Sequence, residues 1–237
     1  MALQLDLEEQ EQIDELKHFW ARWGDYVVWV LIIILGAYAA WNGWHYWQRR
    51  EASQSAILFE TVERASESAD LALMDRSFGD IKEKFGSTTY ANQAAFLVAK
   101  VYYEKAQSAK AEEALNWVIK SASEEGYRSL ARLRLAGLMI DKGDFAQAKA
   151  LLAEKVVAEF EPLVEDRLGD IDTLDKHSDT AKGHYLKSWR GLDAHAPYRK
   201  YVEAKLNAIG VDPTIDGTTS GVTSSSSKST LESKDHQ

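Results

Sequence analysis

The sequence contains no cysteine and only three prolines among its 237 residues. The lack of cysteine excludes a disulfide framework and a thiolate metal site, and it is compatible with either the cytosol or the bacterial periplasm. The first proline is Pro162, so the whole chain before it is free of proline, and this part is rich in Ala, Leu, Glu and Lys. Such a stretch predicts helix.

Basic character is also scarce, since the net charge is −9 at pH 7. A protein that binds nucleic acid needs a basic face to release counterions, so we expect no nucleic-acid partner. The acidity is concentrated in residues 1–25, which hold seven acids and two bases. Ile13, Leu16, Trp20 and Trp23 recur there at helical spacing, which predicts a short amphipathic helix in an acidic N-terminal segment. Its acidic face is either solvated or contacts a protein, because anionic lipid would repel it.

One long apolar run follows this segment. Residues 26–48 contain no charged side chain apart from the titratable His45. As a helix, this run spans roughly 33 Å, enough to cross a bilayer core. Six of the eight tryptophans lie between residues 20 and 47 and gather near the two ends, as expected at membrane interfaces. We therefore predict a single transmembrane helix over residues 26–48, in contact with membrane lipid.

A cleaved signal peptide is the competing interpretation of this run. Ala37-Tyr38-Ala39 has the small-x-small spacing of a cleavage site, but the segment before the run is long and acidic, and bulky tryptophans extend the run past that site. We interpret the helix as uncleaved. The positive-inside rule leaves its orientation open, because two basic residues precede it and three follow closely: Lys17 and Arg22, then Arg49, Arg50 and Arg64.

Small residues share one face of the predicted membrane helix. They are Gly36, Ala39, Ala40 and Gly43, at spacings of three, four and seven from the first. Small side chains allow two membrane helices to approach closely, so this face is a candidate packing site for another transmembrane helix. Gly and Ala are also common in membrane helices that have no specific partner.

The region over residues 49–210 consists of helical blocks separated by Gly, Ser, Asp or Pro, and nothing in it alternates with the period of a strand. Small residues recur twelve apart in three successive units: Ala99 and Ala111, Ala136 and Ala148, Gly169 and Ala181. Paired small residues allow two antiparallel helices to cross closely, as in tetratricopeptide repeats of about 34 residues. The match is degenerate, since Asp172 stands where an aromatic residue is expected.

We therefore predict an all-α fold: one N-terminal transmembrane helix, then a tetratricopeptide-like α-solenoid of helical hairpins. A poorer first unit is expected over 52–85, and the helix 197–209 is expected to cap the open end of the stack. The tail, residues 211–237, is rich in Gly, Ser and Thr and is expected to be disordered.

No motif for catalysis, metal binding or nucleotide binding occurs. The sequence has no GxGxxG, no GxxxxGK[ST] and no GxSxG. His177, His184 and His195 lie too far apart, across a helix break, to converge as metal ligands, and we interpret them as surface histidines. We expect a protein that is not an enzyme and has no cofactor.

A repeat domain of this kind offers a concave face lined by the first helix of each hairpin. The register predicts Phe96, Lys100, Tyr103, Leu130, Leu133 and Ile140 on this face, beside Gln93 and Gly137. Exposed apolar patches often bind a partner, which makes the first six candidate partner-binding residues. The competing interpretation is that the leucines and isoleucine are covered by neighbouring helices.

Five stretches of the chain resemble the YfgM family of ancillary translocon subunits of Gram-negative bacteria, over about residues 8–210. They are Glu11–Trp20, Trp44–Trp47, Leu168–Asp170 with Asp179–Ala181, and Ala204–Asn207. The Ser-rich tail is not part of the family pattern. The resemblance implies a single-pass protein of the bacterial inner membrane with a cytoplasmic N-terminus and periplasmic repeats.

The resemblance further implies association with the SecYEG channel and with the anchored periplasmic chaperone PpiD. The implied role is to help newly translocated polypeptides pass from the channel to periplasmic chaperones. A second hypothesis is a structural or assembly scaffold of another cell-envelope complex, or a repeat protein that associates with itself.

Overall fold

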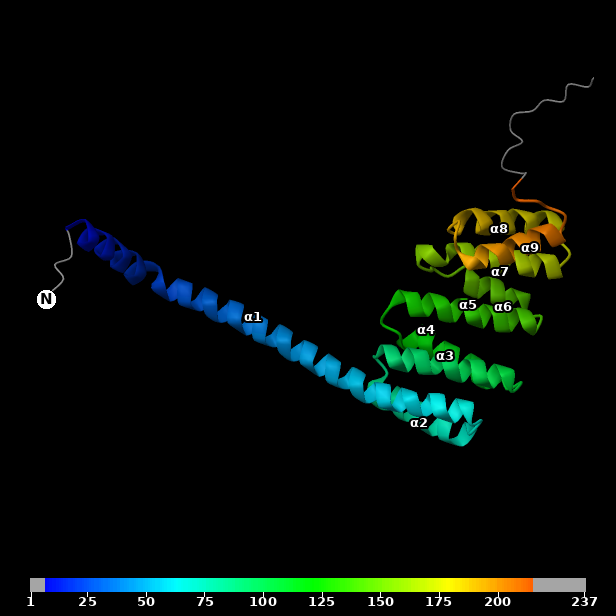
Figure 1. The fold of residues 1–237 in the computed structure, drawn as a ribbon, viewed down its shortest axis with the longest axis horizontal. Coiled ribbons are helices and arrows are strands. Elements are labelled where there is room, and N and C mark those ends of the chain that lie inside the picture. Colours follow the sequence, from blue (N-terminus) through cyan, green and yellow to red (C-terminus); the bar gives the residue numbers. More distant parts are fainter. Residues whose placement is uncertain (1–6, 215–237) are drawn as a thin grey trace, which may run out of the picture.

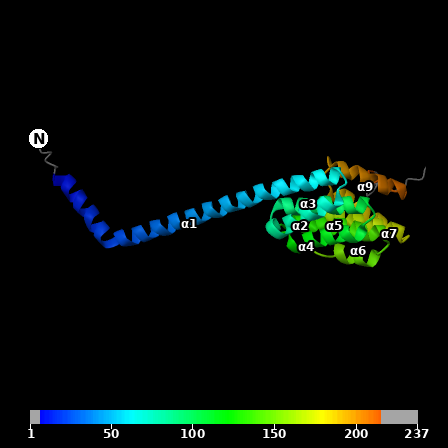
Figure 2. The same cartoon turned by 90° about the horizontal axis from the view of Figure 1, so that it is seen from below.

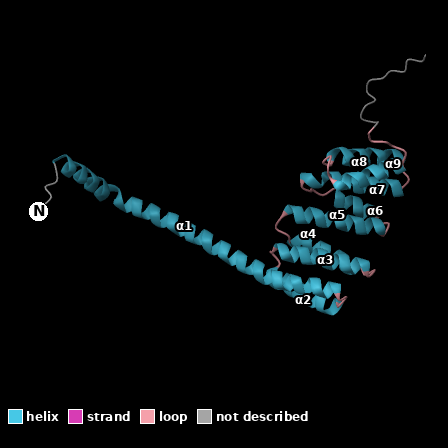
Figure 3. Ribbon diagram, in the orientation of Figure 1, coloured by secondary structure: helices cyan, strands magenta, loops and turns pink. Residues whose placement is uncertain are grey.

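The computed structural model describes residues 7–214, with side chains from residue 20 onward, and over this range it contains helices and no strand (Figure 3). The helices are α1 (Leu7–Glu67), α2 (Leu71–Phe85), α3 (Thr89–Glu104), α4 (Ser108–Ser121), α5 (Glu125–Asp141), α6 (Phe145–Leu152), the short 3₁₀ helix η1 (Ala158–Phe160), α7 (Glu161–Leu174), α8 (Ser178–Gly191) and α9 (Pro197–Ala208).

The helices form hairpins that stack in chain order (Figure 1). The C-terminal part of α1 pairs with α2, and the next pairs are α3 with α4, α5 with α6 and α7 with α8, while α9 packs on α8 at the far end. This arrangement confirms the predicted all-α solenoid, including its first unit and its capping helix.

The turn inside each hairpin has the same backbone geometry. One residue in each turn adopts a positive φ: Ala69, Ala106, Gly143 and Lys176. The next residue donates its backbone N–H to a carbonyl five positions earlier, at 2.8–2.9 Å in all four turns, which closes a Schellman motif. The repeat is therefore visible in the backbone, although a glycine marks only one of the four turns.

The small residues predicted at the helix crossings are buried. Ala111, Ala136, Ala148 and Ala181 have no exposed surface, and Ala99 is 5% exposed. At Gly169, a Cβ atom would lie 2.6 Å from both Cδ1 and Cε1 of the Tyr185 ring. Helices α7 and α8 can therefore cross at this distance only with glycine at position 169.

Helix α1 is continuous from Leu7 to Glu67 and bends near its N-terminal end (Figure 2). It joins the predicted amphipathic segment, the predicted membrane span and the first helix of the repeats without a break, because neither Pro nor a strong turn signal interrupts them. Within the described residues, one stretch, Trp20–Glu67, is long and apolar enough to cross a membrane, and the protein buries none of its most apolar window. The side chains of Ile13 and Leu16, and the tail beyond residue 214, lie outside the described residues.

The interpretation of His184 as a surface histidine is wrong. Its ring lies half-buried between α7 and α8, with Nδ1 2.6 Å from Glu165 Oε2 and Nε2 3.6 Å from Asp172 Oδ2. Asp172 is itself buried at the position where the repeat pattern expects an aromatic residue, and Lys149 of α6 contacts it at 3.1 Å. Polar partners therefore offset the cost of burying this carboxylate.

The cap is fixed to the third hairpin by a buried ion pair. Asp166 of α7 has no exposed surface, and both of its carboxylate oxygens lie 2.8 Å from Lys205 Nζ of α9. Tyr198 Oη donates a further hydrogen bond to Asp166 at 2.7 Å. Val202 and Leu206 of α9 are fully buried in a small core with Ala181 and Tyr185.

Candidate protein-interaction groove

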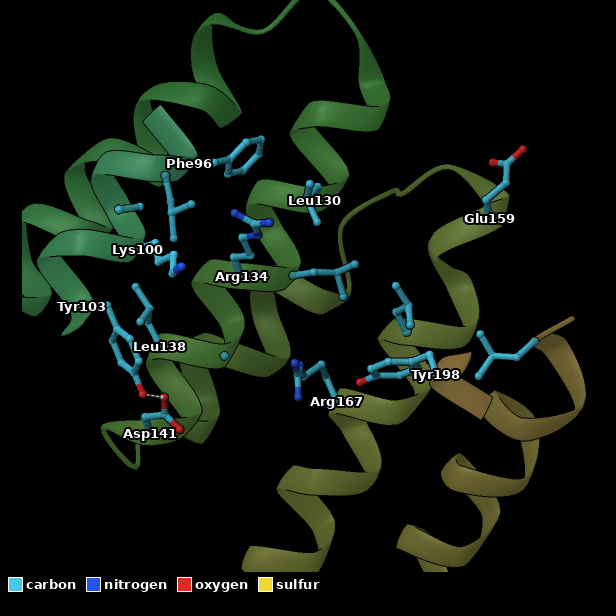
Figure 4. A pocket seen from close by; sticks show the side chains of 16 residues that line it. Phe96, Lys100, Tyr103, Leu130, Arg134, Leu138, Asp141, Glu159, Arg167 and Tyr198 are labelled. Atoms are coloured by element: carbon cyan, nitrogen blue, oxygen red, sulfur yellow. Dashed lines mark hydrogen bonds between the residues drawn. The ribbon is translucent and has the colours of Figure 1, made fainter. Parts of the chain in front are cut away.

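A groove of about 670 Å³ opens on the face of the stack that α3, α5 and α7 share (Figure 4). These are the first helices of three successive hairpins, so the groove follows from the repeat itself. Its apolar lining includes Phe96 of α3, Leu130 and Leu133 of α5, Leu163 of α7, and Leu192 at the end of α8. The size and lining are those of a binding site.

Five of the six residues predicted on the concave face line this groove. Phe96 and Leu133 are largely buried, Leu130 is half-buried, and Lys100 and Tyr103 are exposed. Ile140 does not line it, and instead packs, partly buried, against the main core. Neighbouring helices thus cover Ile140, as the competing interpretation expects, and leave the groove open beside Leu130, where partner binding stays a prediction.

The groove extends further along the chain than the predicted face. Leu163 and Arg167 of α7 line it, and they occupy the same positions in the third repeat unit as Leu130 and Arg134 occupy in the second. Aligning the two units on their small residues, Ala136 and Gly169, would therefore have predicted that Leu163 and Arg167 lie on the same face. Tyr198 from the cap could not be found in this way, because α9 does not follow the repeat.

Three cations face the groove from three different helices. They are Lys100 of α3, Arg134 of α5 and Arg167 of α7, and Figure 4 shows their side chains directed toward the cavity. Arg134 lies over the Phe96 ring, with its guanidinium carbon 4.5 Å from the ring centre. Partial loss of water around this guanidinium lowers the pKa of Arg134.

Two walls of the groove are held by tyrosine hydrogen bonds. Tyr103 Oη donates to Asp141 Oδ2 at 2.7 Å and ties α3 to α5, and this bond raises the pKa of the Tyr103 hydroxyl. Tyr198 is held by Asp166 at the opposite wall, where burial raises the pKa of the Tyr198 hydroxyl. The groove is thus largely formed before a ligand enters it.

Among the residues that the structure describes, no cluster of three His, Asp or Glu side chains could hold a metal ion. The groove instead brings together apolar and aromatic surface, three cations, two acids and two tyrosine hydroxyls, which makes it a candidate surface for a protein partner.

The predicted packing face on the membrane helix is exposed. Gly36, Ala39, Ala40 and Gly43 all lie on the open surface of α1, and a Cβ at either glycine would meet no atom within 4 Å. The face is therefore available to another helix, and its role in packing stays a prediction.

Comparison with known proteins places the chain among repeat proteins. The model of the tetratricopeptide repeat-like domain family matches residues 17–211. A Neisseria gonorrhoeae protein named ancillary SecYEG translocon subunit is 25% identical over 207 residues, which cover 86% of this chain and 98% of that protein. A Haemophilus influenzae protein of the same name is 23% identical over 182 residues, covering 76% of this chain and 87% of that protein. No solved structure matches significantly.

Proposed function

Since this chain belongs to the tetratricopeptide repeat-like domain family, we propose that it is a membrane-anchored interaction scaffold, an ancillary subunit of the SecYEG translocon. In this role its groove binds segments of newly translocated polypeptide and helps to pass them to periplasmic chaperones, among them PpiD. The observation that carries the proposal is the open, apolar groove on a repeat domain that continues directly from an apolar helix. The names of the two relatives, which align along most of this chain, support the same partner.

The proposed topology puts the N-terminus in the cytoplasm and residues 51–237 in the periplasm of a Gram-negative cell. A groove that receives translocated polypeptide must lie on the side where the polypeptide emerges. Protease added to spheroplasts should therefore remove the repeat domain. Protection of this domain, while a periplasmic control protein is cut, would reverse the orientation and remove the groove from its proposed ligand.

Association with the channel is tested by affinity purification of the full chain after extraction in mild detergent. The proposal predicts that the channel subunits co-purify. Recovery of other envelope proteins without channel subunits, or of the chain alone, would favour a scaffold of another envelope complex or a self-associating protein.

The role of the groove is tested by filling it. Gly137 lines the groove, and a Cβ there meets no atom within 4 Å, so Gly137→Leu introduces a larger side chain at the groove wall from an unobstructed Cβ position. Gly183 of α8 is also helical, exposed and free of close atoms, and Gly183→Leu is the matched control outside the groove. Only Gly137→Leu should abolish binding of client polypeptide, and equal binding by both variants would exclude the groove as the client site.

A further inference from the structure

The centre of the groove carries a cation that the fold does not neutralise. Within residues 20–214, no carboxylate forms an ion pair with Arg134, and its contact is the Phe96 ring. The other arginines of the same helix differ, since Arg128 and Arg132 both contact Glu125, at 2.7 and 2.8 Å. On α5, therefore, the two arginines outside the groove have a carboxylate partner, and the one that lines the groove has none.

The remaining charges of the groove leave Arg134 as its accessible anion-binding point. Arg167 already contacts Asp170 at 3.0 Å, and Lys100 lies 3.7 Å from Glu104. Two acids, Asp141 and Glu159, also line the groove; Asp141 accepts the hydrogen bond from Tyr103, and neither acid forms an ion pair with Arg134. The three lining cations outnumber these two acids, and Arg134 is the one without an acidic partner, which favours a negatively charged group on the ligand beside it.

The guanidinium of Arg134 is arranged to receive a carboxylate. When its plane stacks on an aromatic ring, the N–H donors along its edge stay free for a bidentate hydrogen bond. The groove around it is apolar, formed by Leu130, Leu133 and Leu163. A ligand that satisfies both features has a carboxylate with apolar side chains close to it.

We propose that the groove selects polypeptide segments in which an acidic side chain is flanked by apolar residues, with Arg134 binding the carboxylate. This inference rests on the proposed function, because it names the class of client segment that the same groove takes. A segment with a basic residue at this position would meet three cations and be rejected. The acidic side chain is thus the feature that separates preferred clients from other apolar segments.

The test uses the full chain in detergent and fluorescent peptides with blocked ends, so that no terminal charge contributes. The three peptides differ only at the central residue, which is glutamate, glutamine or lysine, and each has four leucines in all, two on either side of it. Anisotropy titration should show roughly tenfold tighter binding for the glutamate peptide than for the glutamine peptide, as for one charge-assisted hydrogen-bonded pair. The lysine peptide should bind more weakly still, and the preference for glutamate should shrink at about 1 M salt.

Two variants assign the preference to Arg134. Arg134→Gln should bind the glutamate and glutamine peptides about equally, whereas Arg76→Gln, at an exposed arginine of α2 outside the groove, should keep the preference. Gly137→Leu should bind none of the peptides. Any change in anisotropy that remains with this variant comes from peptide that enters the detergent micelles, so the variant also serves as the control for that partition. A variant that ends at Thr214 should bind the peptides as tightly as the full chain does. Tighter binding by this variant would mean that the chain's own C-terminal segment competes for the groove, and this result would overturn the proposal.

The outcomes separate the two levels of the argument. If Gly137→Leu abolishes binding but wild type binds the three peptides equally, the selectivity is refuted and the client groove stands. If Gly137→Leu binds all peptides as wild type does, the groove is not the client site and both proposals fail.

Discussion

Gly169 allows the closest helix crossing in the repeats, and replacing it with alanine tests the repeat architecture directly. The new methyl group would lie 2.6 Å from two carbons of the Tyr185 ring. The ring cannot move aside easily, because Tyr185 is 3% exposed and its hydroxyl donates to Asp170 at 2.9 Å and contacts Thr173 Oγ1 at 3.1 Å. Either α8 shifts or these hydrogen bonds break.

The expected cost follows from two opposing effects. Overpacking of a closed interior costs about 1–3 kcal/mol. Alanine is favoured over glycine inside a helix by about 1 kcal/mol, which offsets part of that cost. The net loss of up to about 2 kcal/mol corresponds to a melting temperature lower by up to about 8 °C for a domain of this size.

Gly137→Ala is the matched control, since Gly137 is also helical but has open space around its Cβ position. There the helix preference acts alone, and the melting temperature should rise by about 2–4 °C. Thermal unfolding of the full-length variants, followed by circular dichroism, measures both. If Gly169→Ala is as stable as Gly137→Ala, then α7 and α8 do not cross at Gly169 and the register of the third hairpin is wrong.

Three further predictions concern other parts of the molecule. Ala136→Trp should force α5 and α6 apart at a buried crossing, cost about 1–3 kcal/mol or more and lower the melting temperature by several degrees; an unchanged melting curve would place Ala136 on the surface. Burial raises the pKa of Tyr185 and Tyr198, so the folded state keeps both protonated where the unfolded state, with a pKa near 10, does not. The contribution of these two tyrosines to the free energy of unfolding should therefore be complete below about pH 10, and above it the free energy of unfolding should fall by up to about 1.4 kcal/mol per tyrosine per pH unit. A urea midpoint that stays constant from about pH 9 to 11.5 would contradict this. Replacing Gly36 and Ala40 together with Leu should preserve membrane insertion but weaken co-purification of membrane partners, with an unrelated anchor helix of equal length as the control. If the double variant and the swapped anchor both retain every partner at wild-type levels, recognition lies in the repeats and the helix only anchors the protein.

The local features of the repeats could be read from the sequence because they depend on residues that are close in the chain. Turn residues mark the helix ends, and pairs of small residues such as Ala136 and Ala148 indicate where the two helices of one hairpin cross. The positive φ angles of Ala69, Ala106 and Lys176 could not be predicted in the same way, since alanine and lysine carry no preference for that conformation. The Schellman hydrogen bonds of the hairpins impose it.

The features that the sequence did not predict depend on contacts between separate helices. Asp166 reads as a solvated acid until Lys205, far along the chain in α9, is placed against it by the cap. His184 reads as a surface residue because neither Glu165 nor Asp172 is its helical neighbour. Arg134 follows Leu130 by four residues and so shares the predicted concave face, whereas Arg132 contacts Glu125; that Arg134 has no such acidic partner could not be read from the sequence.

The central claim is that the groove contacts polypeptide as it leaves the channel. Site-specific photo-crosslinking measures this most directly, with a photoreactive amino acid in place of Leu130 in the groove or of Tyr201, which is 66% exposed on α9 outside it. In cells that hold a secretory protein arrested in the channel, position 130 should form an adduct with the arrested polypeptide, position 201 should not, and Gly137→Leu should remove the adduct. Equal adducts from both positions, or none from position 130 while the channel still co-purifies, would contradict the account.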